Sequence, residues 1–183
     1  TEEELRECYE HLVNEKNTRR LLLEEHVSGD DYRIYVVGEK VAGACRRIPA
    51  FVTGDGQKTI RELIRGKNSR RRLNPFLSKG LIRPDLEIDN MLKRQAFTYD
   101  SIPAEGRYVQ LRQKANASAG GDVEDVTDVL PREIKRAAVA AVRAIPGLAA
   151  GGVDVLYDST LPERLNFVVI ELNARAHIGV NMY

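Results

Sequence analysis

Three oxygen-bearing side chains near the end of the sequence could together bind a cation. Glu171 and Asn173 lie two residues apart in the apolar stretch 166–173, and Asp154 lies in the shorter apolar stretch 153–157. If both stretches are strands that pair, side-chain alternation gathers all three residues on one face. Neither stretch contains a Lys or Arg, and two carboxylates with an amide suit Mg²⁺, which prefers oxygen ligands. The same pattern is equally typical of a solvated sheet face with ordinary polar residues.

A polar loop rich in small residues follows the predicted strand 107–112. The residues of this loop that could contact an anion are Arg112, Asn116, Ser118, Gly120 and Gly121. Glycine lets backbone N–H groups approach an anion closely, and arginine adds a planar fork for carboxylate or phosphate. The combination would suit an acyl phosphate or a tetrahedral intermediate. Taken alone, the loop is more typical of a flexible turn after a strand.

The early part of the chain contains a weaker nucleotide signal. Residues 21–27 begin apolar and end polar, and Asp31 follows the Ser28-Gly29 turn. A strand of this kind can bind an adenine edge, and a carboxylate just past the turn can accept hydrogen bonds from ribose hydroxyls. A buried strand that ends in solvated acids is the interpretation that this segment favours by itself. Arg46 and Arg47 end a later strand, so one of them could face phosphate while the other meets solvent.

The elements that must position these residues follow from the spacing of apolar residues and from turn signals. Helices are expected over residues 1–17, 59–64, 86–95 and 131–145. Strands are expected over residues 21–27, 32–37, 41–48, 107–112, 153–157 and 166–173. Because most strands follow one another as hairpins and helices interrupt them, this order favours an α+β fold over a doubly wound sheet.

Residues 66–84 are basic and are interrupted by Pro75, Gly80 and Pro84. This composition predicts a mobile basic loop. Its run of three arginines, residues 70–72, could contact RNA, but no aromatic residues are interleaved with the charges. A solvated run of charges is therefore the favoured interpretation.

Composition excludes several classes of protein. The chain has 183 residues, of which 43% are hydrophobic and 30% charged, so it can form a folded core. The 28 Lys and Arg nearly balance the 27 Asp and Glu, so neither nucleic acid nor a membrane surface is expected as a partner. No apolar run approaches the roughly 20 residues of a membrane helix, and no secretory leader is visible. The two cysteines cannot form a disulfide framework, which favours a reduced, cytoplasmic setting.

Four segments, taken in order, resemble the ATP-grasp superfamily. LLLEEHVSGDDYRIYVVGEKVAGACRRIPAFVTGDGQKTIRELI, residues 21–64, resembles its nucleotide-linker strand and the following hairpin. YVQLRQKANASAGGDVEDVTD, residues 108–128, resembles a segment typical of cyanophycin synthetases and bifunctional glutathione-synthesis enzymes. GGVDVL, residues 151–156, and FVVIELNARAHIG, residues 167–179, resemble the paired metal-binding strands of the superfamily.

The resemblance implies an α+β fold: an ATP-grasp C-terminal lobe, which is a mainly antiparallel sheet with flanking helices like the ATP-binding domain of glutathione synthetase. Residues 1–183 would be a partial ATP-grasp domain whose N-terminal lid lobe is largely missing. Glu24, Glu25 and Val27 would then line the adenine, Asp31 would hold the ribose, and Arg47 would contact phosphate. Further residues carried over by resemblance are Asp154, Glu171 and Asn173 as ligands of one or two Mg²⁺ ions (or Mn²⁺), Arg112 and Asn116 as catalytic groups, and Ser118, Gly120, Gly121 and Arg175 as substrate contacts.

The implied reaction is that of an ATP-dependent carboxylate–amine ligase. A small-molecule or peptide carboxylate would attack the γ-phosphate of ATP, and an amine would displace phosphate from the acyl phosphate to form an amide or peptide bond. The chain would be a ligase fragment that is inactive alone. Whether it forms a homo-oligomer is left open. The alternative is a non-catalytic ATP-binding or interaction module on the same scaffold.

Overall fold

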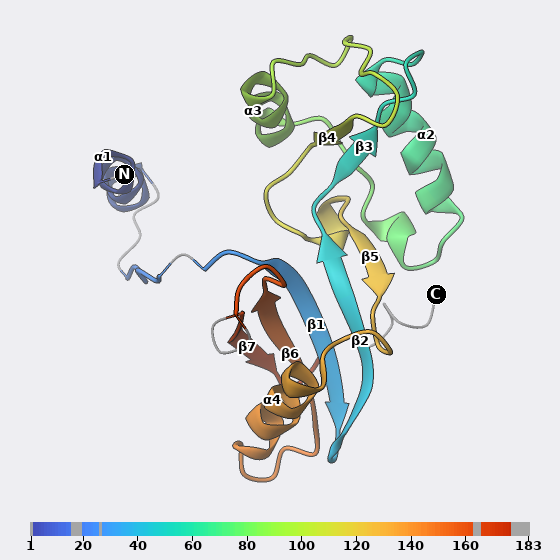
Figure 1. Cartoon of the computed structure of the whole chain (residues 1–183). Coiled ribbons are helices and arrows are strands. Elements are labelled where there is room, and N and C mark those ends of the chain that lie inside the picture. The colour runs from blue at the N-terminus through green and yellow to red at the C-terminus, as the bar shows by residue number, and fades with distance from the viewer. Residues whose placement is uncertain (1, 16–19, 26, 163–165, 177–183) are drawn as a thin grey trace.

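A computed structural model describes residues 2–15, 20–25, 27–162 and 166–176 of the chain (Figure 1). The helices are α1 (Glu2–Glu10), α2 (Ile60–Arg72), α3 (Leu86–Arg94) and α4 (Arg132–Arg143), with a π-helical turn at His11–Glu15 and 3-10 turns at Leu77–Lys79 and Ala117–Ala119. The strands are β1 (Asp30–Val37), β2 (Lys40–Ile48), β3 (Phe51–Thr53), β4 (Tyr108–Gln110), β5 (Asp122–Asp125), β6 (Ala150–Tyr157) and β7 (Phe167–Asn173). The predicted α+β class is confirmed.

A five-stranded antiparallel sheet in the order β5-β2-β1-β6-β7 forms the larger part of the fold. β1 and β2 form a hairpin, and Gly38 in its turn has a φ of 60°, a conformation that glycine adopts without a steric penalty. β6 and β7 pair as the sequence predicted, and a bulge lies between Asp154 and Val155. This pairing brings the two segments with the candidate metal ligands together.

Helix α4 covers one face of this sheet (Figure 1). Its residues Ile134, Ala138 and Val142 are fully buried against Ile34 and Val153 of the strands. The period of these three positions is that of one helix face, so the apolar stripe predicted from sequence faces the sheet. The opposite face of β1 and β6 carries the charged residues Asp31, Arg33 and Asp154.

A smaller unit at one end of the sheet is formed by the β3–β4 ribbon with α2 and α3 (Figure 1). Its core contains Ile60, Ile64, Ile88, Leu92 and Val109, each at most 4% exposed. Helix α2 begins with a capping box. The Thr59 hydroxyl accepts from the N–H of Glu62 at 3.3 Å, and the Glu62 carboxylate accepts from the N–H of Thr59 at 2.8 Å.

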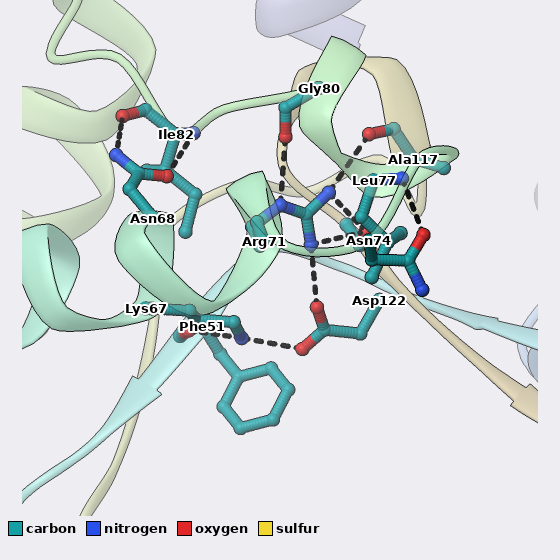
Figure 2. A network of polar contacts seen from close by, with 11 residues as sticks. Phe51, Lys67, Asn68, Arg71, Asn74, Leu77, Gly80, Ile82, Ala117 and Asp122 are labelled. Carbon is teal, nitrogen blue, oxygen red and sulfur yellow. Dashed lines mark hydrogen bonds and ion pairs between the residues drawn. The ribbon is translucent and has the colours of Figure 1, made fainter. Parts of the chain in front are cut away.

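The prediction of an irregular basic loop over residues 66–84 is wrong for its first part, because α2 continues to Arg72. Figure 2 shows why the basic run folds. Arg71 is only 3% exposed, donates to the carbonyl of Gly80 at 2.8 Å and forms an ion pair with Asp122 at 2.7 Å. Asp122 lies about fifty residues away in sequence, so local composition cannot reveal it. The mobility of residues 73–84 stays a prediction.

The strand predicted over residues 21–27 is also wrong for the residues that the structure describes. Residues 20–25 and 27 belong to neither a helix nor a strand, and residue 26 lies outside the described residues. Leu22 and Leu23 are 80% and 76% exposed. A strand needs a hydrogen-bonding neighbour, and no described strand pairs with this segment. Of the helix predicted over residues 1–17, positions 1, 16 and 17 lie outside the described residues.

Candidate functional site

The predicted metal ligands lie on one face of the sheet, opposite α4. Asp154 of β6 and Glu171 of β7 are direct cross-strand partners, and Asn173 is opposite Gly152 one strand repeat away. Residues directly opposite in an antiparallel pair have Cβ atoms roughly 5 Å apart. The sequence pattern therefore placed these three oxygen donors on one face correctly.

Two arginines from neighbouring strands hold the Asp154 carboxylate. Arg33 of β1 donates through Nε to Oδ1 at 2.5 Å and through Nη2 to Oδ2 at 2.6 Å. Arg47 of β2 donates through Nη2 to Oδ2 of Asp154 at 3.1 Å, and its Nε donates to Asp31 at 2.9 Å. Asp31, Arg33, Arg47 and Asp154 therefore form one alternating chain of charges, which we call the Asp154 cluster.

Arg33 is the residue of this cluster that sequence reasoning missed. The observation that the strands of Asp154 and Glu171 contain no basic residue was correct, but the neutralising charges come from β1 and β2. The available signal was the spacing of Asp31 and Arg33, which puts both side chains on one face of a strand. Recognising it also required the pairing of β1 with β6, which is a long-range feature of the fold.

Burial sets the electrostatics of the Asp154 cluster. The Asp154 side chain is 4% exposed, whereas those of Arg33 and Arg47 are 20% and 22% exposed. Burial raises the pKa of Asp31 even though Arg47 favours its ionised form. The hydrogen bond to Asp154 raises the pKa of Arg33. Cys45, opposite Arg33 on β2, is a buried thiol whose pKa burial raises to about 11, so it is not poised as a nucleophile.

The donor set fits Mg²⁺ by type, since two carboxylates and one amide offer hard oxygen ligands. Its present partners constrain that fit, because both oxygens of Asp154 accept from arginine while Glu171 is exposed and Asn173 is half-buried. In the described part of the chain, no group of three or more His, Cys, Asp or Glu residues is arranged to hold a metal. A cation at this face would therefore share Asp154 with Arg33 or displace it.

The structure brings some of the other predicted nucleotide residues together with Asp154 and leaves others apart. Asp31 lies in the Asp154 cluster, where its carboxylate is bound by Arg47. Glu24 and Glu25 are exposed in the segment before β1, and Val27 is half-buried. Among the described residues, no hydrogen bond or ion pair joins Glu24 or Glu25 to the cluster. Their predicted role beside adenine stays a prediction.

The predicted catalytic loop is held by structural contacts. Arg112 follows β4 and pairs with Asp85 and Glu87 at the start of α3, each at 2.5 Å, while its buried Nε has no hydrogen-bond partner. Asn116 accepts from the N–H of Ser118 at 3.1 Å and from its hydroxyl at 2.8 Å. Arg112 and Asn116 therefore bind different partners within the protein.

The two glycines of this loop also have packing reasons to be glycine. Gly120 has a φ of 97°, and a Cβ there would lie 2.5 Å from Cγ1 of Ile82. A Cβ on Gly121 would lie 2.8 Å from the carbonyl oxygen of Ile48. Close backbone packing explains both residues, and anion binding by their N–H groups stays a prediction. Arg175, predicted to contact substrate, is exposed just after β7.

Comparison with solved structures gives the class of the fold. The chain matches the crystal structure of a bifunctional glutathione synthetase from Pasteurella multocida with a TM-score of 0.73 and 31% identity, covering 87% of this chain and 22% of that one. The ATP-grasp ligase PsnB, solved with Mg and ADP, is a more distant match, with a TM-score of 0.39 and 19% identity. On the first of these matches, the α+β architecture corresponds to part of a bifunctional glutathione synthetase.

Sequence comparison gives the relatives. The chain is 36% identical over 171 residues to the glutathione biosynthesis bifunctional protein GshAB of Clostridium perfringens, covering 89% of this chain and 21% of the relative. It is 32% identical over 176 residues to the same protein of Desulfotalea psychrophila, covering 92% and 22%. No family model matches the chain. The chain is therefore homologous to the ATP-grasp region of bifunctional glutathione-synthesis proteins, and it spans about a fifth of their length.

Among the residues that the structure describes, no helix has the length and apolar character that crossing a bilayer requires.

Proposed function

We propose that this chain contributes the phosphate- and metal-binding face of an ATP-dependent carboxylate–amine ligase. The observation that supports this most directly is the cross-strand pair Asp154 and Glu171 on a face that also carries Arg33 and Arg47. Homology to proteins named for glutathione biosynthesis agrees with it. The substrates would be a small-molecule or peptide carboxylate and an amine.

The reaction we propose has two displacements. A carboxylate oxygen attacks the γ-phosphorus of ATP, ADP leaves, and an acyl phosphate forms. The amine nitrogen then attacks the acyl carbon, phosphate leaves, and the nitrogen loses a proton to give the amide. Such phosphoryl transfer needs positioning and charge neutralisation more than covalent help from the protein.

The residues of the Asp154 cluster would bind and orient the nucleotide. Arg47 bridges Asp31 and Asp154, so its guanidinium can exchange a carboxylate for a phosphate oxygen without losing ionic partners. Asp31 would accept from the ribose hydroxyls. Arg33 would act as a positioning residue, because its two hydrogen bonds fix the plane of the Asp154 carboxylate.

Asp154, Glu171 and Asn173 would hold one or two Mg²⁺ ions, with Mn²⁺ as the other candidate. A metal held by these three residues would supply positive charge to offset the negative charge of the transferring phosphoryl group. The remaining assignments that come from resemblance belong to the same proposal: Glu24, Glu25 and Val27 beside adenine, Arg112 and Asn116 beside the acyl phosphate, and Ser118, Gly120, Gly121 and Arg175 beside the substrate.

The first experiment measures binding of ATP with Mg²⁺ to the 183-residue chain by isothermal titration calorimetry. Glu171→Gln removes one exposed carboxylate of the proposed site, and we expect it to weaken binding at least tenfold. Glu133→Gln, an exposed carboxylate at the start of α4, is the matched control and should leave the affinity unchanged. Equal affinities of Glu171→Gln and the unsubstituted chain would refute the site.

A non-catalytic ATP-binding module is the second candidate, and the ion pairs that Asp154 and Arg112 form with protein partners favour it. The two candidates separate in a chimera in which this chain replaces the matched segment of the Pasteurella multocida enzyme. ADP release that requires both a carboxylate substrate and an amine substrate supports the ligase. The substrates to be tested first are the parts of the glutathione tripeptide. A folded chimera that binds ATP with Mg²⁺ and releases no ADP supports the module.

A further inference from the structure

A cavity of about 510 Å³ lies between β3 and α2. Its volume falls within the range of roughly 300–1,000 Å³ that is usual for small-molecule sites. The charged and aromatic residues that line it are Phe51, Lys67, Arg70, Arg71 and Asp122. Asp122 pairs with Ile48, whereas Val123 pairs with Arg47, so alternation puts the Asp122 side chain on the face opposite Arg47. The cavity is therefore separate from the Asp154 cluster.

Positive charge exceeds negative charge in the lining of this cavity. Lys67, Arg70 and Arg71 contribute three cations, and Asp122 is the single acid among the lining residues. Lys67 and Arg71 share that carboxylate, at 2.5 Å and 2.7 Å (Figure 2). Burial lowers the pKa of both cations, although Asp122 favours their charged forms. A second anion in the cavity would be stabilised.

Of the three cations in the lining, Lys67 and Arg70 are the two that could donate to a ligand. The three guanidinium nitrogens of Arg71 already donate to the carbonyls of Gly80, Gly121 and Ala117 and to Asp122, so Arg71 forms part of the wall. The Lys67 ammonium donates to the carbonyl of Phe51 and to Asp122, and its third N–H is left for a ligand. Arg70 is exposed and forms no ion pair within the described residues.

One wall of the cavity is apolar and aromatic. The Phe51 ring stacks on Tyr108 with centroids 4.6 Å apart, and the Lys67 ammonium lies 3.8 Å from the Phe51 centroid. Leu63 and Leu77 also line the cavity. An anion bound at Lys67 would therefore lie beside a surface that favours an apolar or planar substituent, which inorganic phosphate does not have.

We propose that this cavity binds a small organic acid, whose carboxylate is taken by Lys67 and Arg70 and whose apolar part lies against Phe51 and Leu77. The carboxylate would replace the water around Lys67 with a charge-assisted hydrogen bond. None of the lining residues belongs to the Asp154 cluster, although Arg71 of the wall donates to the carbonyls of Ala117 and Gly121 in the neighbouring loop.

The test titrates the 183-residue chain with sodium benzoate, followed by chemical-shift changes in nuclear magnetic resonance spectra at fixed ionic strength. We expect saturable binding whose largest shifts lie at residues of α2 and β3. Arg70→Gln should weaken it at least fivefold. Arg72→Gln, an exposed arginine on the same helix that does not line the cavity, should leave it unchanged. The uncharged analogue benzyl alcohol should bind at least tenfold more weakly than benzoate.

Phe51→Leu, with its fold checked by circular dichroism, provides a second variant that keeps every charge. It should weaken benzoate and leave any weak binding of inorganic phosphate unchanged. Equal losses in Arg70→Gln and Arg72→Gln would overturn the proposal, because they would show nonspecific charge attraction. Phosphate that binds as tightly as benzoate, or benzoate that does not saturate, would also overturn it. Binding of ATP with Mg²⁺ to Arg70→Gln should equal that of the unsubstituted chain, so failure here leaves the ligase proposal intact.

Discussion

Replacing Asp154 by asparagine tests whether the Asp154 cluster stabilises the fold as its geometry implies. Asparagine keeps the size and one acceptor oxygen, so the substitution removes charge without making a cavity. Arg47 retains Asp31, whereas Arg33 has no other ion pair among the described residues. Leaving one partner of a buried pair uncompensated costs about 3–5 kcal/mol. Because a fifth of the Arg33 side chain remains exposed, we expect about 2–3 kcal/mol, at or below the lower end of that range.

The free energy of unfolding is measured by urea denaturation followed by circular dichroism. For a chain of this size, a loss of that order should lower Tm by roughly 4–12 °C. Glu171→Gln is the matched control across the strand pair, and because Glu171 is exposed it should change stability by at most about 0.5 kcal/mol. In a double-mutant cycle with Arg33→Met, the two losses should sum to more than the loss of the double variant. Asp154→Asn as stable as the unsubstituted chain, or strictly additive losses, would refute the reasoning.

Two further predictions concern the smaller unit. Thr59→Ala removes the hydroxyl that accepts from the N–H of Glu62 and should cost about 1 kcal/mol of unfolding free energy, measured by urea denaturation, whereas Thr59→Ser should cost much less. The hydrogen bond from Lys58 and those from the N–H groups of Lys58 and Gln57 lower the pKa of Asp55 from 3.8 to about 2. Because this pKa is lower in the folded chain than in the unfolded chain, ionised Asp55 stabilises the fold at pH values above 3.8. This contribution is lost as the pH falls toward 2. Carbon-detected titration of Asp55 should show its pKa rising toward 3.8 in Lys58→Met, and an unchanged pKa would contradict the contact.

The elements that sequence predicted well are those whose information is local. Helix α4 repeats buried positions at Ile134, Ala138 and Val142 with a helical period, and β1 and β2 join through a short turn around Gly38. Strands β3 and β5 have three and four residues, too short for an alternating pattern to stand out, and sequence reasoning missed both. Each exists because a neighbouring strand offers it hydrogen bonds, which is a property of the folded chain.

The same distinction explains what was predicted of the candidate site. Alternation within β7 and the pairing of the last two strands were enough to place Asp154 beside Glu171. The ion pair of Arg33 with Asp154 joins residues 121 positions apart, and Arg71 finds its partner Asp122 at a distance of 51 positions. A run of basic residues was therefore interpreted as solvated when one of its members is fully engaged. The charged residues of a sequence show which ion pairs are possible, and the topology of the fold determines which of them form.

The charge balance of the Asp154 cluster constrains how a nucleotide and a cation could bind at this face. Asp31 and Asp154 are matched by Arg33 and Arg47, so the four side chains carry no net charge. A cation arriving alone would have to take Asp154 from Arg33 and leave a guanidinium uncompensated, and a phosphate arriving alone would leave a carboxylate uncompensated. When both arrive together, the carboxylates can turn to the cation and the arginines to the phosphate, so that each charge keeps an opposite neighbour. Under the proposed function, the affinity for either one should therefore depend on the presence of the other.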